Sequence, residues 1–217
     1  AFVGDEENAS AGMRGVLPVL SKMKEEGTDF LTVINTEPGE AGHSGESGPM
    51  IFLGTLGKLM PSFYVRGRAS HVGNYYSGFS SALALSRIVS YLEGNPHLAD
   101  PLNGKCEPSW ICLDMALMKK GYSTTVPDRG YAYFNCFTTT NTPADVMEQM
   151  KVMSEYAMDQ TLAQLTGSYR SLVAIGHESK SFNILRPKVY SLEEITEIAR
   201  KNFGPLFNEE LASFIRD

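Results

Sequence analysis

Residues 1–8 read Ala-Phe-Val-Gly-Asp-Glu-Glu-Asn, and residues 33–38 read Val-Ile-Asn-Thr-Glu-Pro. Each stretch is a short apolar run of the kind that forms a strand, and each ends in carboxylates. Residues 12–26 between them have apolar side chains at helical spacing, so we expect strands over 2–4 and 30–35 joined by a helix. Pro18 lies within the helical pattern and predicts that the helix begins close to it, because a first turn tolerates proline.

The acidic residues of this unit follow the expected strands directly. In an open parallel sheet, ligands bind outside the carboxyl ends of the strands, where side chains converge on a crevice. Glu6 and Glu7 point in different directions if the chain stays extended, so one could bind a metal while the other transfers a proton. Glu37 could supply a second oxygen ligand. The alternative is a solvated turn at residues 5–7 and a surface acid at Glu37, since charge runs are usually exposed to water.

The remainder of the chain has a different pattern of elements. Helical periodicity covers 78–93 and begins again at Thr142, where Thr-Pro-Ala-Asp has the residues of a helix start. Strands are expected over 62–68, 109–118, 130–138 and 171–176. Strand, helix, strand, strand, helix, strand is the split βαβ order, which makes an antiparallel four-stranded sheet with two helices on one face. The tail from residue 190 reads as helical, with Ser191 as its cap.

A second polar motif follows the strand expected over 62–68. Residues 66–73 read Arg-Gly-Arg-Ala-Ser-His-Val-Gly and lead into a loop rich in Gly, Asn and Tyr, which suits an exposed polar role for His71. The alternative is a surface histidine that bonds locally. The other histidines have weaker cases: His43 reads as a solvated loop residue, His97 as a surface cap, and His177 lacks an acidic partner at ligand spacing.

Three landmarks stand in order along the chain: strand-Asp-Glu-Glu, strand-Glu-Pro, and Gly-Arg-Ala-Ser-His. This order resembles the di-zinc hydrolase family of aminoacylases, dipeptidases, glutamate-releasing carboxypeptidases and succinyl-diaminopimelate desuccinylase. Within that family the chain looks most like the RocB-like arginine-utilisation proteins, at residues 36–38, 53–61, 70–73 and 133–135. The similarity extends to about residue 174.

The resemblance implies an α/β fold in which part of a zinc-peptidase catalytic domain carries an inserted ferredoxin-like (βαββαβ) α+β lid domain. The expected domains are a partial catalytic domain over 1–57, a lid and dimerisation domain over 58–180, and a return to the catalytic domain over 181–217. The chain begins at Ala1 without methionine, within an expected strand, and it lacks the family's early His-x-Asp, bridging aspartate and late histidine. We therefore expect a fragment.

The resemblance also implies roles for individual residues. Glu6 looks like the family's general base, Glu7 like a ligand of one zinc, and Glu37 like a ligand of the other. His71 matches the lid histidine that reaches across a dimer to polarise the substrate carbonyl. Many members carry an arginine in the third lid strand that clamps the substrate carboxylate, where this chain has Asn135. An amide lacks the charge and the bidentate fork of arginine, so we expect Asn135 to donate a neutral hydrogen bond to the substrate instead.

Composition narrows the class of protein. The 217 residues carry a net charge of −6 and no basic cluster, which argues against nucleic acid or an anionic membrane as a partner. No apolar run approaches the roughly 20 residues of a membrane span, and no signal peptide precedes the first expected strand. The three cysteines, Cys106, Cys112 and Cys136, form no Cys-x-x-Cys motif and indicate reduced thiols in a cytoplasmic protein, with Cys112 and Cys136 in the core.

These observations predict a cytoplasmic metal-dependent hydrolase that cleaves an amide bond of an N-acyl amino acid or small peptide. The resemblance to the RocB-like arginine-utilisation proteins suggests arginine or ornithine catabolism. A complete site would hold two zinc ions, and the protein would form a homodimer through its lid domain. The fragment itself is expected to be inactive and to bind zinc poorly, because Glu7 and Glu37 are only part of the ligand set. The alternative is a non-catalytic fold relative whose lid domain dimerises or binds a metabolite.

Overall fold

The computed structural model describes residues 10–32, 34, 55–104, 106–119, 121–176, 182, 186–204 and 206–216. By contacts along the backbone the chain divides into two compact units, residues 1–53 and 54–217. The division expected from the sequence, into 1–57, 58–180 and 181–217, stays a prediction. None of the described helices is long and apolar enough to cross a membrane.

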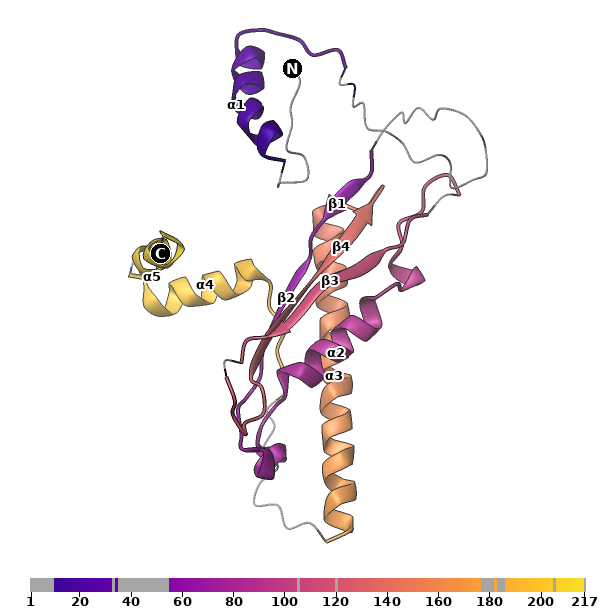
Figure 1. The fold of residues 1–217 in the computed structure, drawn as a ribbon, viewed down its shortest axis with the longest axis vertical. Coiled ribbons are helices and arrows are strands. Elements are labelled where there is room, and N and C mark those ends of the chain that lie inside the picture. Colours follow the sequence, from indigo (N-terminus) through magenta and orange to yellow (C-terminus); the bar gives the residue numbers. More distant parts are fainter. Residues whose placement is uncertain are drawn as a thin grey trace. The chain divides into compact units, whose positions relative to one another are not determined.

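The described part of the first unit contains the helix α1 (Ala11–Glu25), drawn in indigo in Figure 1. The predicted helix is confirmed, but the prediction that it starts close to Pro18 is wrong, because full turns precede the proline. The predicted strand over 30–35 is also wrong where residues are described: 30–32 and 34 are not in a strand, and Leu31 and Ile34 are 92% and 80% exposed. No described segment pairs with them, and a strand without a partner is not stable.

The second unit is built on an antiparallel sheet whose central strand is β4 (Arg129–Thr138). The strand β3 (Trp110–Leu117) pairs with one edge of β4. Along the other edge, β1 (Gly57–Leu59) and β2 (Ser62–Arg66) lie end to end, as Figure 1 shows. Pro61 falls at the break between them, where its carbonyl accepts the N–H of Phe134 at 3.0 Å. Proline has no N–H of its own, so it interrupts a ladder at an edge.

Two helices cover one face of this sheet, α2 (Ser81–Leu92) and α3 (Pro143–Ala174). Paired strand residues that share this face form the core with apolar residues from both helices. The most deeply buried members are Ala84, Leu85, Leu92, Trp110, Ala132, Phe134 and Ala157. Thr142 and Asp145 form the capping box predicted at the start of α3, and Ser80 caps α2 by accepting the Leu83 N–H at 3.3 Å.

The predicted fourth strand over 171–176 is wrong. The helix α3 continues through Ala174, and Gly176, with φ of 97°, follows its end. A left-handed glycine is a common helix terminator, so the residue read as a strand end is a helix end. A short apolar run such as 172–174 has no period that separates a strand from a helix. The described residues thus have the order strand, helix, strand, strand, helix, without the closing strand of the predicted fold.

The tail of the chain is helical, as predicted, and forms α4 (Leu192–Phe203) and α5 (Leu206–Arg216). Ser191 and Glu194 make the expected capping box at the start of α4. Glu194 also lies 2.6 Å from the Lys151 ammonium of α3, which ties this end of the tail to the long helix. Two short 3₁₀ helices, η1 (Val72–Ser77) and η2 (Pro96–Leu98), flank α2 in the chain.

Candidate functional site

The candidate site described by the structure is the loop that carries His71, between β2 and η1. Two backbone hydrogen bonds hold it against the segment before β4: Val72 N–H donates to the Thr124 carbonyl at 2.9 Å, and Val126 N–H donates to the Ser70 carbonyl at 2.8 Å. His71 lies between these two bonds and forms an antiparallel bridge with Thr125. His71 therefore lies in a loop whose backbone is hydrogen-bonded to residues 124–126, close to the end of the sheet where β4 begins.

Gly67 of the same motif allows the chain to pass close to α2. A Cβ atom at Gly67 would collide with the carbonyl oxygen of Phe79. Arg68 and Phe79 exchange two backbone hydrogen bonds, both 2.9 Å long, at this crossing. Only a residue without a side chain fits where two backbones approach so closely, and this steric constraint explains the glycine at position 67.

The His71 imidazole is exposed, and one of its two nitrogens has a fixed partner. Its Nδ1 accepts the N–H of Gly73 at 3.1 Å and caps η1. A neutral imidazole has one accepting and one donating nitrogen, so this hydrogen bond assigns the proton to Nε2. The ring thus presents an N–H donor at the surface, the kind of group that stabilises a developing oxyanion.

Asn135, the predicted substrate contact, lies near the opposite end of β4. It pairs with Ile111 of β3 and is only 7% exposed. The last residue of β2, Arg66, pairs with Arg129, the first residue of β4, and His71 lies beyond that pair. From residue 129 to 135 the strand rises by roughly 20 Å. The structure therefore does not bring His71 and Asn135 together within one chain.

The three predicted acids, Glu6, Glu7 and Glu37, lie outside the described residues, as do His43 and His177. Where the chain is described, no three His, Cys, Asp or Glu side chains lie close enough together to hold a metal ion. His97 is an exposed residue of η2 whose backbone N–H donates to the Asn95 side chain at 3.0 Å, in agreement with a surface cap.

The cysteines are free thiols with different burial. Cys136 lies in the core as predicted, Cys112 is half-buried against it, and Cys106 is exposed. Burial, together with the nearby charge of Asp100, raises the pKa of the Cys136 thiol to about 11. Burial and the Glu93 carboxylate also raise the pKa of Cys112. Thiols kept protonated at neutral pH are poor nucleophiles, so Cys112 and Cys136 are packing residues here.

Asp100 is a key polar residue that sequence reasoning missed. Its carboxylate is 8% exposed and accepts the backbone N–H groups of Thr139, Thr140 and Asn141, each at 2.7 Å, and the Thr140 hydroxyl at 2.5 Å. Burial by itself raises the pKa of Asp100, but these hydrogen bonds outweigh it and hold the pKa well below its usual range. The residue fixes the turn between β4 and α3. No local pattern marks it, because its partners lie about 40 positions away.

Replacing Asp100 with alanine should lower the free energy of unfolding at pH 7 by about 3 kcal/mol, because several part-buried donors lose a charged acceptor. Asp100→Asn is the matched control: one amide oxygen can still accept the three N–H groups, so we expect a loss of about 1 kcal/mol. Urea denaturation of the chain and both variants measures these differences. Equal stability of all three proteins would contradict the structural role.

The advantage of the native chain over Asp100→Asn should also depend on pH. A carboxyl group whose pKa is lowered by folding stabilises the protein fully above its unfolded pKa, about 4, and less as the pH falls through its native pKa. The difference in unfolding free energy between the two proteins should therefore shrink as the pH is lowered from 6 to 2. A difference in unfolding free energy that grows as the pH is lowered would contradict the stabilising role of the Asp100 carboxylate.

The chain is similar in sequence to two curated proteins. It is 30% identical to Protein RocB of Bacillus subtilis (strain 168) over 197 residues, which are 90% of this chain and 35% of that protein. It is 26% identical to Uncharacterized protein YqjN of the same strain over 164 residues, 75% of this chain and 30% of that protein. The chain thus spans about a third of the length of these relatives. No protein-family model matches the chain. The two similarities support a RocB-like family.

Proposed function

We propose that the chain is part of a RocB-like hydrolase that cleaves an amide bond of an N-acyl amino acid or small peptide, in arginine or ornithine catabolism in the cytoplasm. The observation that carries the proposal is the extent of the similarity to RocB. A match of 197 residues cannot be contained in residues 54–217, so it reaches into the first unit as well. The order of motifs along the chain supports the same assignment.

The proposed chemistry places two zinc ions at the acid-ended segments of the first unit. Glu7 and Glu37 would each ligate one ion, with the remaining ligands supplied from outside this chain. Bound zinc supplies a water of lowered pKa and polarises a carbonyl group. The Glu6 carboxylate would accept a proton from that water and return it to the leaving nitrogen. This part of the proposal rests on the sequence pattern, since the three acids lie outside the described residues.

The role proposed for His71 is to donate its Nε2–H to the substrate carbonyl oxygen in the site of a partner subunit. The exposed ring, its fixed Nδ1 bond to Gly73 and its paired loop support this role. Asn135 would donate a neutral hydrogen bond to the substrate. Successive side chains of a strand point to opposite faces, and Phe134 and Cys136 face the core, so the Asn135 side chain points away from the helices. A homodimer through the lid domain would be needed to bring two chains together.

Metal removal tests the proposed activity in the complete gene product. A panel of N-acyl amino acids and dipeptides, N-acyl-arginine and N-acyl-ornithine among them, is assayed for release of free amine before and after treatment with a zinc chelator. We expect hydrolysis that is lost on chelation and returns with added zinc, because the water needs the metal to be reactive at neutral pH. A zinc-loaded protein that cleaves nothing in the panel would contradict the proposal and favour a non-catalytic relative that binds a metabolite.

A further inference from the structure

One edge of β2 has no strand partner in the part of the chain that the structure describes. The hydrogen bonds at Pro61 and Gly67, 3.0 and 2.6 Å long, mark the two ends of the ladder between β2 and β4. Bonded and non-bonded pairs alternate in an antiparallel ladder, so the odd-numbered residues bond to β4. The backbone N–H and C=O groups of Ser62, Tyr64 and Arg66 therefore point to the free edge.

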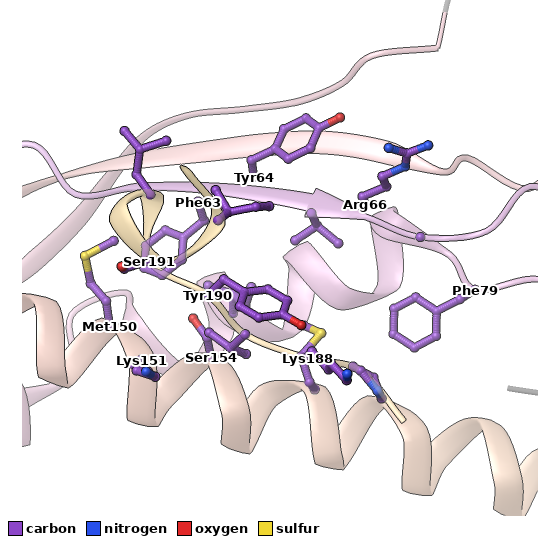
Figure 2. A pocket seen from close by; sticks show the side chains of 18 of the residues that line it. Phe63, Tyr64, Arg66, Phe79, Met150, Lys151, Ser154, Lys188, Tyr190 and Ser191 are labelled. Carbon is purple, nitrogen blue, oxygen red and sulfur yellow. The ribbon is translucent and has the colours of Figure 1, made fainter. Parts of the chain in front are cut away.

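A cavity of about 680 Å³ lies along this free edge (Figure 2). The helix α3 forms its floor, and residues 186–191, which belong to no helix or strand, also line it. Its volume falls within the range of about 300–1,000 Å³ that is usual for ligand pockets. The five residues of β2 span roughly 17 Å, enough for a short strand beside them. In the split βαβ order, a fourth strand would take this position.

The interior of this groove is apolar and adaptable. Phe63 and Val65 of β2 face Met147, Met150 and Met158 of α3 across it. Figure 2 shows Phe63 on the side of β2 toward α3 and Arg66 directed away from that helix. Methionine side chains are flexible and polarizable, so they accommodate different apolar partners. The groove can therefore accept alternate side chains of an extended chain.

The charge of the groove is opposite to that of the whole chain. The charged residues that line it are all basic, Arg66, Arg68, Lys151, Arg186 and Lys188, although the net charge of the chain is −6. Lys151 pairs with Glu194 at 2.6 Å, and Arg186 lies 3.5 Å from Asp159. The ion pairs found among the described residues do not involve Arg66 or Lys188. A carboxylate of a partner strand would complement Arg66.

We propose that this groove binds an extended peptide segment that adds to the free edge of β2 as a strand and alternates apolar side chains with carboxylates. Its apolar side chains enter the groove between β2 and α3, and its carboxylates lie near Arg66 on the other side of the sheet. The backbone groups at this edge of β2, which no described strand pairs with, favour a peptide over a free acyl anion, because an anion would leave them bonded to water.

A labelled, blocked peptide of alternating valine and glutamate tests the proposal on the 217-residue chain. We expect a saturable rise in fluorescence anisotropy and slower hydrogen exchange at the amides of Ser62, Tyr64 and Arg66. The same peptide with N-methyl groups on alternate amides cannot pair with β2 and should bind roughly tenfold more weakly, a comparison that leaves the protein unchanged. Absence of saturable binding, or equal binding of the N-methylated peptide, would overturn the proposal.

Two pairs of variants locate the contact. Tyr64→Pro removes an N–H that points to the free edge, where proline is tolerated, and should weaken binding roughly tenfold, whereas Tyr64→Ala keeps the N–H and should stay within about threefold. Arg66→Glu should also weaken binding roughly tenfold at low salt, and Lys58→Glu, on β1 outside the groove, should not. Binding unaffected by Tyr64→Pro and Arg66→Glu would overturn the proposal. So would tight binding of a fatty-acid anion that slows exchange at none of the three amides, since the groove would then be an acyl site.

Discussion

Glu6→Gln should reduce amide hydrolysis by the complete gene product roughly 10²–10⁴-fold while its zinc content stays unchanged. Glutamine keeps the size of glutamate but cannot accept a proton, and general acid–base catalysis is worth a factor of this order. Glu7→Gln should lose zinc as well as activity, because a neutral amide is a much weaker ligand than a carboxylate. Metal analysis and turnover on the same preparations separate the two roles.

The control for this pair is Glu25→Gln, at the last residue of α1, which is exposed and is assigned no role in the chemistry. It should retain both zinc and turnover. Equal zinc loss in the Glu6 and Glu7 variants would refute the division between base and ligand. Full activity in both variants would remove the two acids from the site altogether.

His71→Ala should lower kcat by roughly 10²–10³-fold, or about 2.7–4 kcal/mol, the scale for losing one oxyanion donor. The residue is exposed, so folding should be preserved. His71→Ala also removes the cap on η1, because Nδ1 accepts the Gly73 N–H, and loss of this cap contributes to the fall in kcat. His71→Asn separates the two contributions: its side-chain oxygen can take over the cap, but it has no donor at the Nε2 position. Its activity should be as low as that of His71→Ala, and His97→Ala should be fully active.

Mixing variants tests whether the histidine acts across subunits. In a mixed dimer of His71→Ala and Glu6→Gln chains, one site has both an intact base and an intact histidine from the other chain. Activity should therefore reappear on mixing and approach a quarter of the native value when subunits exchange freely. A mixture that stays inactive, although subunit exchange is demonstrated, would place the histidine in its own chain's site or outside the chemistry.

Local sequence determined most of the individual elements of the second unit. Helical periodicity and capping residues predicted α2, α3 and α4, and the capping boxes at Thr142 and Ser191 form as expected. These signals are readable because a cap and a helical face involve residues only three or four positions apart. Strands β2, β3 and β4 were likewise predicted by alternation and apolar runs.

The failed predictions have two kinds of cause. The apolar run at 171–176 was too short to show a period, and it continues the last turns of α3. Residues 30–32 and 34 form no strand because no described segment pairs with them. Asp100 escaped notice because its hydrogen-bond partners are brought to it by folding from the far side of β3 and β4. For Asp100 and for residues 30–32 and 34, the deciding contacts lie outside the local window of sequence.

The candidate site divides in the same way. The sequence by itself determined which residue types can do chemistry, the acids Glu6, Glu7 and Glu37 and the histidine in the Gly-Arg-Ala-Ser-His motif. Only the tertiary structure decided that His71 pairs with Thr125, that Asn135 lies far along β4 from it, and that the edge of β2 faces a basic groove. The physical reason is that strand pairing joins positions dozens of residues apart, and the register of that pairing, rather than any local preference, sets which groups meet and which edges stay open.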